Sequence, residues 1–267
     1  MKNIPWHTKL VLALIIFLPV YFMIAALGTK IGLWTYKIGL GVMVIQAGFP
    51  LLMLVAIVAL VSLIIGIVKK PRRKVVIGAA AVGLLVPFAA LGSLASLGGT
   101  AAENPIHDVA TDTANPPMFS AETMAARAES EANPVNDYQI PLGETEMYAG
   151  AAPELAIKSH AQIINDTYAN LSPLPLGGAS KSDAVAAVAA AMGNMGLSDI
   201  RTDAEAGIVE GVAETFWYGF KDDVVARVGD AEIDFRSVSR VGQSDLGANA
   251  ARIAELRELV AAQIGQR

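Results

Sequence analysis

The sequence has no cysteine and few charged residues, and its acidic residues are confined to one part of the chain. Without cysteine there is no disulfide framework and no thiolate ligand for a metal. Charged residues make up 17% of the 267 residues and apolar residues 54%. In typical soluble domains charged residues make up about 25% and apolar residues about 45–50%. This composition excludes a disordered chain and indicates that part of the protein lies in a membrane.

The absence of acidic residues from the N-terminal part divides the chain in two. Residues 1–99 contain nine Lys/Arg and no Asp or Glu, for a formal charge of +9. Residues 100–267 contain eleven Lys/Arg and all 25 acidic residues, for a formal charge of −14. Nucleic-acid binding needs surfaces rich in Lys and Arg that neutralise phosphates. Because the part that remains in water is acidic, we expect no nucleic-acid partner.

Three apolar runs lie within residues 1–99, at 10–27, about 42–68 and 75–97. A spanning helix needs about 20 mostly apolar residues. Lipid offers the backbone no hydrogen-bond partners, so the backbone groups bond to one another within a helix. We therefore predict a membrane domain at 1–99 with transmembrane helices at about 10–28, 49–68 and 75–97. Residues 32–46 are expected at the interface, where Trp, Tyr and Lys are favoured. A cleaved signal peptide is the alternative for the first run, although that run exceeds the usual length of about 7–15 residues.

The basic residues set the orientation of these spans. Lys69–Lys74 holds five positive charges between the second and third runs, so the positive-inside rule places this loop in the cytoplasm. The N-terminus, with Lys2 and Lys9, is then cytoplasmic, and residues 100–267 are extracytoplasmic. We expect the spans to have membrane lipids as partners. The spans contain no ionisable residue, which argues against an ion or proton pathway.

Residues 100–267 are predicted to form an α+β domain. Residues 100–180 are rich in Pro, Ala and Asn and form an extended lead with a short helix near 120–131, while residues 181–267 form the core. Ser180 begins a capping-box pattern before a helix at 184–195. The last helix is expected at 246–264. Four strands of an antiparallel β-meander lie between these helices, at 197–202, 207–220, 222–228 and 232–241.

A polar segment near the C-terminus contains a candidate anion site. Arg236 and Arg240 are four residues apart on a strand and therefore share a face. Ser244 and Asp245 precede the last helix, whose free N–H groups attract anions. The alternative is structural, with Asp245 capping the helix and Asn249 tying it to the sheet. The candidate binding residues are Arg236, Arg240, Ser244, Asp245, Asn249 and Arg252.

A second candidate set has the side chains of a metal site or an acid/base pair, namely His107, Asp108, Asp112, Asp222 and Asp223. The alternative is a ladder of charges across two strands. A turn at Gly229–Asp230 would place Arg227 opposite Glu232 and Asp223 opposite Arg236. No phosphate-binding loop or dinucleotide fingerprint is present, so we expect no cofactor.

Two motifs resemble a known family. The first runs from Phe220 to Asp223 and continues from Asp234 to Ile253, and the second is Pro105–Asp112 followed by Pro116-Pro117. They resemble domain-of-unknown-function family 1499 over about residues 103–262. The resemblance implies a bacterial, often membrane-anchored protein with no established activity, and it assigns no catalytic residue. Together with the orientation of the spans, it leads us to expect a bacterial inner-membrane protein with a periplasmic domain.

The sequence favours a non-enzymatic accessory or binding module that docks on a membrane-protein complex. Spans without charge and a polar motif explained by structure both support this interpretation. A periplasmic lipid- or anion-binding domain is the alternative, and lipid handling would require an apolar cavity beneath the meander. A metal-dependent hydrolase is the less favoured third class.

Overall fold

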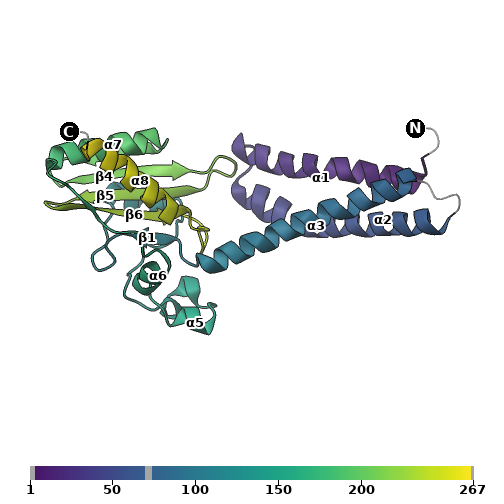
Figure 1. The fold of residues 1–267 in the computed structure, drawn as a ribbon, viewed down its shortest axis with the longest axis horizontal. Coiled ribbons are helices and arrows are strands. Elements are labelled where there is room, and N and C mark those ends of the chain that lie inside the picture. Colours follow the sequence, from purple (N-terminus) through teal and green to yellow (C-terminus); the bar gives the residue numbers. More distant parts are fainter. Residues whose placement is uncertain (1–3, 70–73, 266–267) are drawn as a thin grey trace. The chain divides into compact units, whose positions relative to one another are not determined.

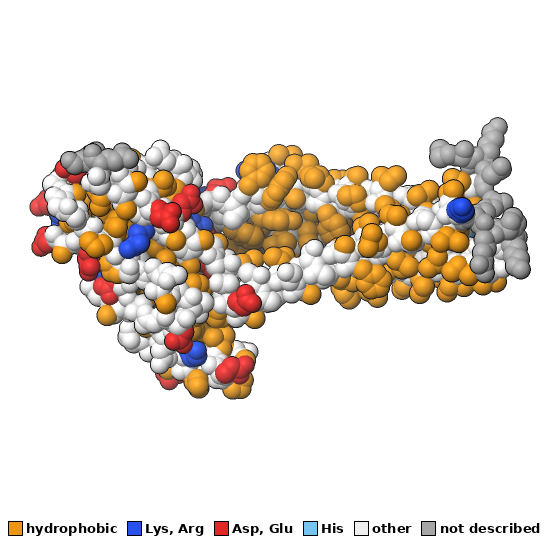
Figure 2. All heavy atoms as spheres, viewed as in Figure 1, with side chains coloured by type: hydrophobic (Ala, Val, Ile, Leu, Met, Phe, Trp, Pro, Cys, Tyr) orange, Lys and Arg blue, Asp and Glu red, His pale blue; other side chains and the backbone are white. Residues whose placement is uncertain are grey.

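The computed structural model describes residues 4–69 and 74–265. The chain divides into two compact units. One contains the N-terminal helices up to Gly98 together with Thr215–Gly219, and the other contains Gly99–Glu214 and the chain from Phe220 onward. Hydrophobic side chains cover the helices of the first unit, whereas acidic and basic side chains are scattered over the second (Figure 2).

The three predicted apolar helices are present as candidate spans. They are α1 (Trp6–Lys30), α2 (Gly48–Val68) and α3 (Lys74–Glu103). A π-helix, η1 (Lys37–Gln46), precedes α2, and the candidate span runs from Lys37 to Val68. Residues 37–46, expected at the interface, are thus helical. In the described chain three helices are long and apolar enough to cross a membrane. Lys2 and residues 70–73 of the basic loop lie outside the described residues.

Gly83 allows the three helices to meet closely. A Cβ atom at this position would lie 2.7 Å from Cγ1 of Val11 on α1 and 2.9 Å from Cβ of Ala59 on α2. Small residues permit such contacts between membrane helices. A Cβ at Gly78 or Gly92 would meet no atom within 4 Å, so those glycines do not mark the contact.

The second unit is built on an antiparallel sheet, which confirms the α+β fold. Its strands are β1 (Asp108–Ala110), β2 (Leu174–Pro175), β3 (Ser198–Asp203), β4 (Ile208–Glu214), β5 (Lys221–Val228) and β6 (Glu232–Ser239). The order is β1-β6-β5-β4-β3, and β2 also pairs with β6. The described sheet thus has six strands, four from the predicted meander and two from the lead.

One face of the sheet carries the main apolar core. Helices α7 (Lys181–Asn194) and α8 (Ala248–Gly265) pack on this face (Figure 1). Val224 and Phe235 on the strands and Leu256 on α8 are fully buried in this core. Ser180 caps α7 as predicted, accepting a hydrogen bond from the N–H of Asp183. Lipid handling would require an apolar cavity beneath the meander, and the buried side chains of Val224, Phe235 and Leu256 occupy the centre of that space.

Part of the lead, including Phe119 and α4 (Ala121–Glu129), covers the opposite face of the sheet, while Ile163 and Ile164 belong to the main core. Helix α4 begins after Ser120, whose hydroxyl accepts from the N–H of Thr123. Phe119 packs on Val225 and Val238, which point away from the main core. The chain then continues through η2 (Leu142–Glu144), η3 (Glu146–Tyr148), α5 (Pro153–Ala156) and α6 (His160–Thr167). The lead therefore contributes structure to both faces and to the sheet itself.

Several predicted boundaries differ from the observed ones, and at two of them the local reason is clear. β4 ends at Glu214, and residues 215–219 form a turn closed by a bond from Gly219 N–H to the Thr215 carbonyl (3.1 Å). The aromatic residues there do not alternate along a strand. α8 begins at Ala248 because Leu246 and Gly247 have φ angles of +58° and +83°, which a right-handed helix excludes.

Candidate functional site

Asp108 and Arg236 form a buried ion pair on the face covered by the lead. Arg236 donates from Nε to Oδ1 of Asp108 (2.9 Å) and from Nη2 to Oδ2 (2.8 Å). The side chains are 0% and 1% exposed. The Tyr138 hydroxyl donates to Oδ1 (2.5 Å), and Arg236 donates further to the carbonyls of Pro117 and Asn136. This bidentate pair occupies the guanidinium N–H groups that an anion site would need and the carboxylate oxygens that a metal or acid/base site would need.

Asp108 stays ionised despite its burial. Desolvation by burial acts to raise the pKa of this carboxyl, but the charge and hydrogen bonds of Arg236, with a bond from Tyr138, outweigh it. They hold the pKa at about 2, below the ordinary 3.8. Asp108 is therefore a fixed anion at neutral pH, which suits an ion pair better than a general acid.

Asp223 joins two arginines from different elements. Arg127 on α4 donates to Oδ2 (2.5 Å), and Arg240, which follows β6, donates to both carboxylate oxygens (2.9 and 2.7 Å). Arg236 and Arg240 share a face as predicted, yet each guanidinium is engaged by a different carboxylate. The two arginines are not brought together around an open anion site.

The register of β5 and β6 differs from the predicted one. Arg227 lies opposite Asp234 instead of Glu232, and Asp223 lies opposite Val238 instead of Arg236. The Gly229 N–H bonds to the Glu232 carbonyl (2.9 Å), so the turn is centred one residue later than expected. This moves the register by two residues and leaves every side chain on its predicted face.

The charge pairing across the sheet therefore survives with new partners. Arg227 bonds to Asp234 (2.8 Å) and to Asp112 (3.1 Å). Asp222 lies on the α8 side of the sheet and accepts from Arg252 (2.7 Å). Each candidate carboxylate thus has its own arginine. Within residues 4–69 and 74–265, no group of three or more His, Asp or Glu side chains could hold a metal ion.

Asn249 ties α8 to the sheet, as the sequence suggested. Its amide nitrogen donates to the His107 carbonyl (2.8 Å) and to the Ser239 hydroxyl (3.0 Å). Its carbonyl oxygen accepts from the Ser237 hydroxyl (2.6 Å) and from Arg252. The side chain is fully buried, so all its polar atoms are used in the interior.

Replacing Asn249 with leucine is expected to destabilise the domain by about 1–3 kcal/mol or more, because several buried partners lose their hydrogen bonds at once. Denaturation of the detergent-solubilised full chain, followed by circular dichroism, measures the change. Glu255→Leu, on the same helix, is the control. Equal stability of the two variants would show that the hydrogen bonds of Asn249 do not hold α8 in place.

Ser244 and Asp245 organise the start of α8. Asp245 accepts from the N–H groups of Gly247 (2.8 Å) and Asn249 (2.7 Å), and the Ser244 hydroxyl donates to the Asn104 carbonyl (2.6 Å). Burial raises the pKa of Asp245 above the ordinary value. The carboxylate therefore occupies the helix end at which an anion was considered.

His107 lies in an aromatic cluster with Tyr138, Tyr148 and His160. Nδ1 of His107 lies 3.0 Å from the Tyr148 hydroxyl, and the ring of His160 stacks on Tyr138 with centroids 5.6 Å apart. His160 is the first residue of α6 and is fully buried. Neither of its ring nitrogens has a hydrogen-bond partner in the described part of the chain.

Burial keeps both histidines neutral. It lowers the pKa of His107, and it lowers the pKa of His160 to about 4 from the ordinary 6.5. The charges of His107 and Arg236 lower the pKa of His160 further, while that of Asp108 raises it. The position of His160 at a helix N-terminus also disfavours its cationic form. Neutral, enclosed imidazoles in this cluster are packing groups at neutral pH.

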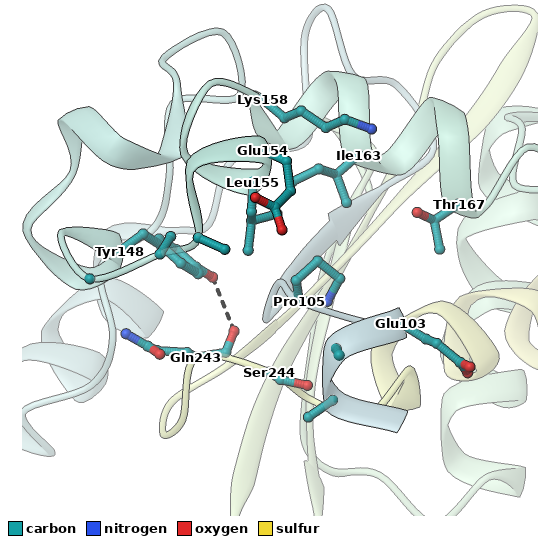
Figure 3. A pocket seen from close by; sticks show the side chains of 15 residues that line it. Glu103, Pro105, Tyr148, Glu154, Leu155, Lys158, Ile163, Thr167, Gln243 and Ser244 are labelled. Carbon is teal, nitrogen blue, oxygen red and sulfur yellow. Dashed lines mark hydrogen bonds between the residues drawn. The ribbon is translucent and has the colours of Figure 1, made fainter. Parts of the chain in front are cut away.

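A pocket of about 710 Å³ lies beside the cluster, where α5 and α6 face the end of α3. Figure 3 shows Leu155 and Ile163 on one side and Pro105 on the other. At its edge the Tyr148 hydroxyl donates to the Gln243 carbonyl (3.0 Å). The other lining residues are Ala101, Ala102, Glu103, Gly150, Ala151, Ala152, Glu154, Lys158, Thr167 and Ser244.

The pocket combines apolar walls with a few charged groups. Small residues at 101–102 and 150–152 leave the space open. Glu103 and Glu154 contribute two carboxylates, and the carboxylate of Glu154 points toward the space in Figure 3. The one lysine, Lys158, is paired with Asp166 (2.8 Å). The pocket therefore favours an apolar molecule whose polar end is neutral or cationic.

Several of these residues are missing from the sequence-based candidates. Arg127 is a single arginine on a short helix, and its sequence gives no sign of the buried partner. Tyr148 and Leu155 lie in a segment without periodicity. One signal in the sequence does mark α6. Ser159 and Gln162 form a capping box, and the residues that follow have an amphipathic pattern.

The fold and the site define a class of protein with three helices long and apolar enough to span a membrane and an α+β domain held together by buried ion pairs. The model of a family described as a protein of unknown function (DUF1499) matches residues 108–260, more than half of the chain. The protein therefore belongs to this family. No curated protein and no solved structure matches the chain.

Proposed function

We propose that the protein is a membrane-anchored, non-catalytic binding module whose pocket holds a small amphipathic molecule. The observation that carries this proposal is the pocket of about 710 Å³, whose lining combines apolar side chains with polar and charged ones. Drug-sized ligands occupy pockets of about 300–1,000 Å³. Part of the lining comes from the last turn of α3, so the pocket follows a spanning helix directly in the chain. A molecule derived from the bilayer suits this location.

The charges favour a ligand with a neutral or cationic polar end. Glu103 and Glu154 lie in the lining, and Lys158 is already paired with Asp166. An anionic headgroup would meet the carboxylate of Glu154, which points toward the space in Figure 3, and a lysine that is already paired. Anion binding by Arg236, Arg240 and Arg252 remains a prediction, and it would first require each arginine to leave a carboxylate.

Catalysis is the less favoured function. The candidate carboxylates are engaged by arginines, and Asp108 is held ionised. The remaining predictions complete the proposal: the bacterial inner membrane as location, a cytoplasmic N-terminus and a periplasmic domain. Docking on another membrane-protein complex also stays a proposal, since the charge-free spans are its support.

Photo-crosslinking tests the ligand preference on the full chain in phospholipid nanodiscs. The probes are a diazirine-bearing long-chain alkylamine and the matching alkyl carboxylate. We expect the amine to label residues 101–105 and 148–167 more strongly than the carboxylate does. Glu154→Lys should reverse the preference, because it replaces a carboxylate at the pocket with an ammonium. Mass spectrometry of the labelled peptides reads out both results.

Ala152→Trp fills the pocket and should reduce labelling by the amine several-fold. Ala186→Trp, at an exposed position of α7, is the matched control and should leave the labelling unchanged. Labelling that is insensitive to both Ala152→Trp and Glu154→Lys would show that the probe does not occupy the pocket, and the proposal would then be wrong.

A further inference from the structure

We infer that the turn between β4 and β5 is a second membrane contact, with Phe216 and Trp217 inserted into the interfacial region of the bilayer. The turn comprises Thr215–Gly219. This contact is separate from the spanning helices and independent of the proposed ligand pocket. Its occupant is lipid at the level of the headgroups and the first acyl carbons.

The first observation is the exposure of two adjacent aromatic side chains. Phe216 is 65% exposed and Trp217 is 43% exposed. Their rings contact each other edge to face, with centroids 5.0 Å apart. Large apolar side chains gathered on a turn mark an interaction surface more often than a single exposed residue does. Trp is also enriched where a membrane meets water, because its ring is apolar and its N–H is polar.

The second observation is the charge around this turn. Residues 215–220 contain no acidic side chain, although residues 100–267 carry a net charge of −14. The ammonium of Lys30, the last residue of α1, lies 4.4 Å from the centre of the Phe216 ring. A cation over an aromatic ring is attracted to it, and a lysine at this level also attracts anionic lipid. The turn itself therefore carries none of the negative charge of the α+β domain, although the exposed Glu214 directly precedes it.

The third observation identifies the occupant. Thr215–Gly219 falls in the compact unit of the spanning helices, although β4 and β5 on either side belong to the other unit. The segment after α1 in that unit contains Trp34, whose Nε1 donates to the Ala25 carbonyl (3.1 Å). Trp34 is an interfacial residue by sequence position, just beyond the end of a spanning helix. The turn thus continues a membrane surface that the same unit already has.

Spin labelling tests this inference on the full chain, because the absence of cysteine allows single labelled sites without background. A nitroxide is attached at Thr215→Cys and, as a matched control, at Asp230→Cys. Asp230 is exposed in the turn at the other end of β5. The chains are reconstituted into vesicles of phosphatidylcholine and phosphatidylglycerol. Power saturation then compares collisions with oxygen, which is concentrated in lipid, and with a water-soluble nickel chelate.

At position 215 we expect an oxygen-to-nickel ratio several-fold higher than at position 230. The double substitution Phe216→Ser/Trp217→Ser should lower the ratio at position 215 to the value at position 230. Both side chains are exposed, so their loss should leave the fold intact. Equal ratios at the two positions in the unsubstituted chain would place the turn in water and overturn the inference. Dipolar broadening between labels at 215 would show a second copy of the chain as the occupant, which also overturns it.

Discussion

Replacing Asp108 with asparagine is expected to destabilise the α+β domain by about 3–5 kcal/mol, because it leaves the charge of Arg236 buried without its partner. Arg236 is 1% exposed and donates two hydrogen bonds to Asp108. An asparagine retains one acceptor and cannot neutralise the guanidinium. Hydrogen exchange of the β5 and β6 amides in the detergent-solubilised full chain measures the free energy of opening.

Asp166→Asn is the matched control for this prediction. Asp166 and Lys158 also form an ion pair, but their side chains are 61% and 45% exposed. Solvent screens such a pair, so its loss should cost about 1 kcal/mol or less. If the β5 and β6 amides are equally protected from exchange in Asp108→Asn and in Asp166→Asn, the buried pair does not hold the lead on the sheet.

The second large effect is expected on lowering the pH. His160 has a pKa of about 4 in the folded chain, against 6.5 when unfolded. The unfolded chain therefore binds a proton first, and stability falls as the pH drops from about 6.5 to about 4. A difference of this size corresponds to a loss of about 3 kcal/mol. His107, whose pKa burial also lowers, acts in the same direction.

His160→Phe isolates the contribution of this residue. Phenylalanine retains a ring to stack on Tyr138, and it loses no hydrogen bond within the described residues because the His160 nitrogens have no partner there. The variant should lose most of the dependence of stability on pH between about 6.5 and 4. Thermal unfolding of both chains across this range is the measurement. Parallel pH profiles would mean that His160 does not titrate in this window.

The sequence predicted the parts of the fold that repeat over many residues. Uninterrupted apolar runs marked the three helices that are long enough to span a membrane. Alternation and turn residues marked β3 to β6, and the stripe including Ile253 and Leu256 marked α8. Strands of two and three residues, such as β2 and β1, are too short for any periodicity to show. They form because the lead lies against β6, a contact between residues far apart in the chain.

The candidate site was predictable in composition and not in arrangement. Opposite charges on the shared face of β5 and β6 were anticipated, but a turn placed one residue later gave each of them a different partner. Arg127 joins Asp223 from 96 positions away in the sequence, and no local pattern reports such a pair. The pocket combines the end of α3 with α5 and α6, so its existence depends on the tertiary fold alone.

We propose that the pocket holds a small amphipathic molecule, and the most direct test is to identify what the pocket contains after purification. The intact chain is purified from its native membrane in mild detergent, and co-eluting molecules are identified by mass spectrometry. We expect one amphipathic small molecule at near-equal stoichiometry, depleted in Ala152→Trp and retained in Ala186→Trp. A stoichiometric protein partner, with equal small-molecule content in both variants, would contradict it and identify the chain as an accessory subunit.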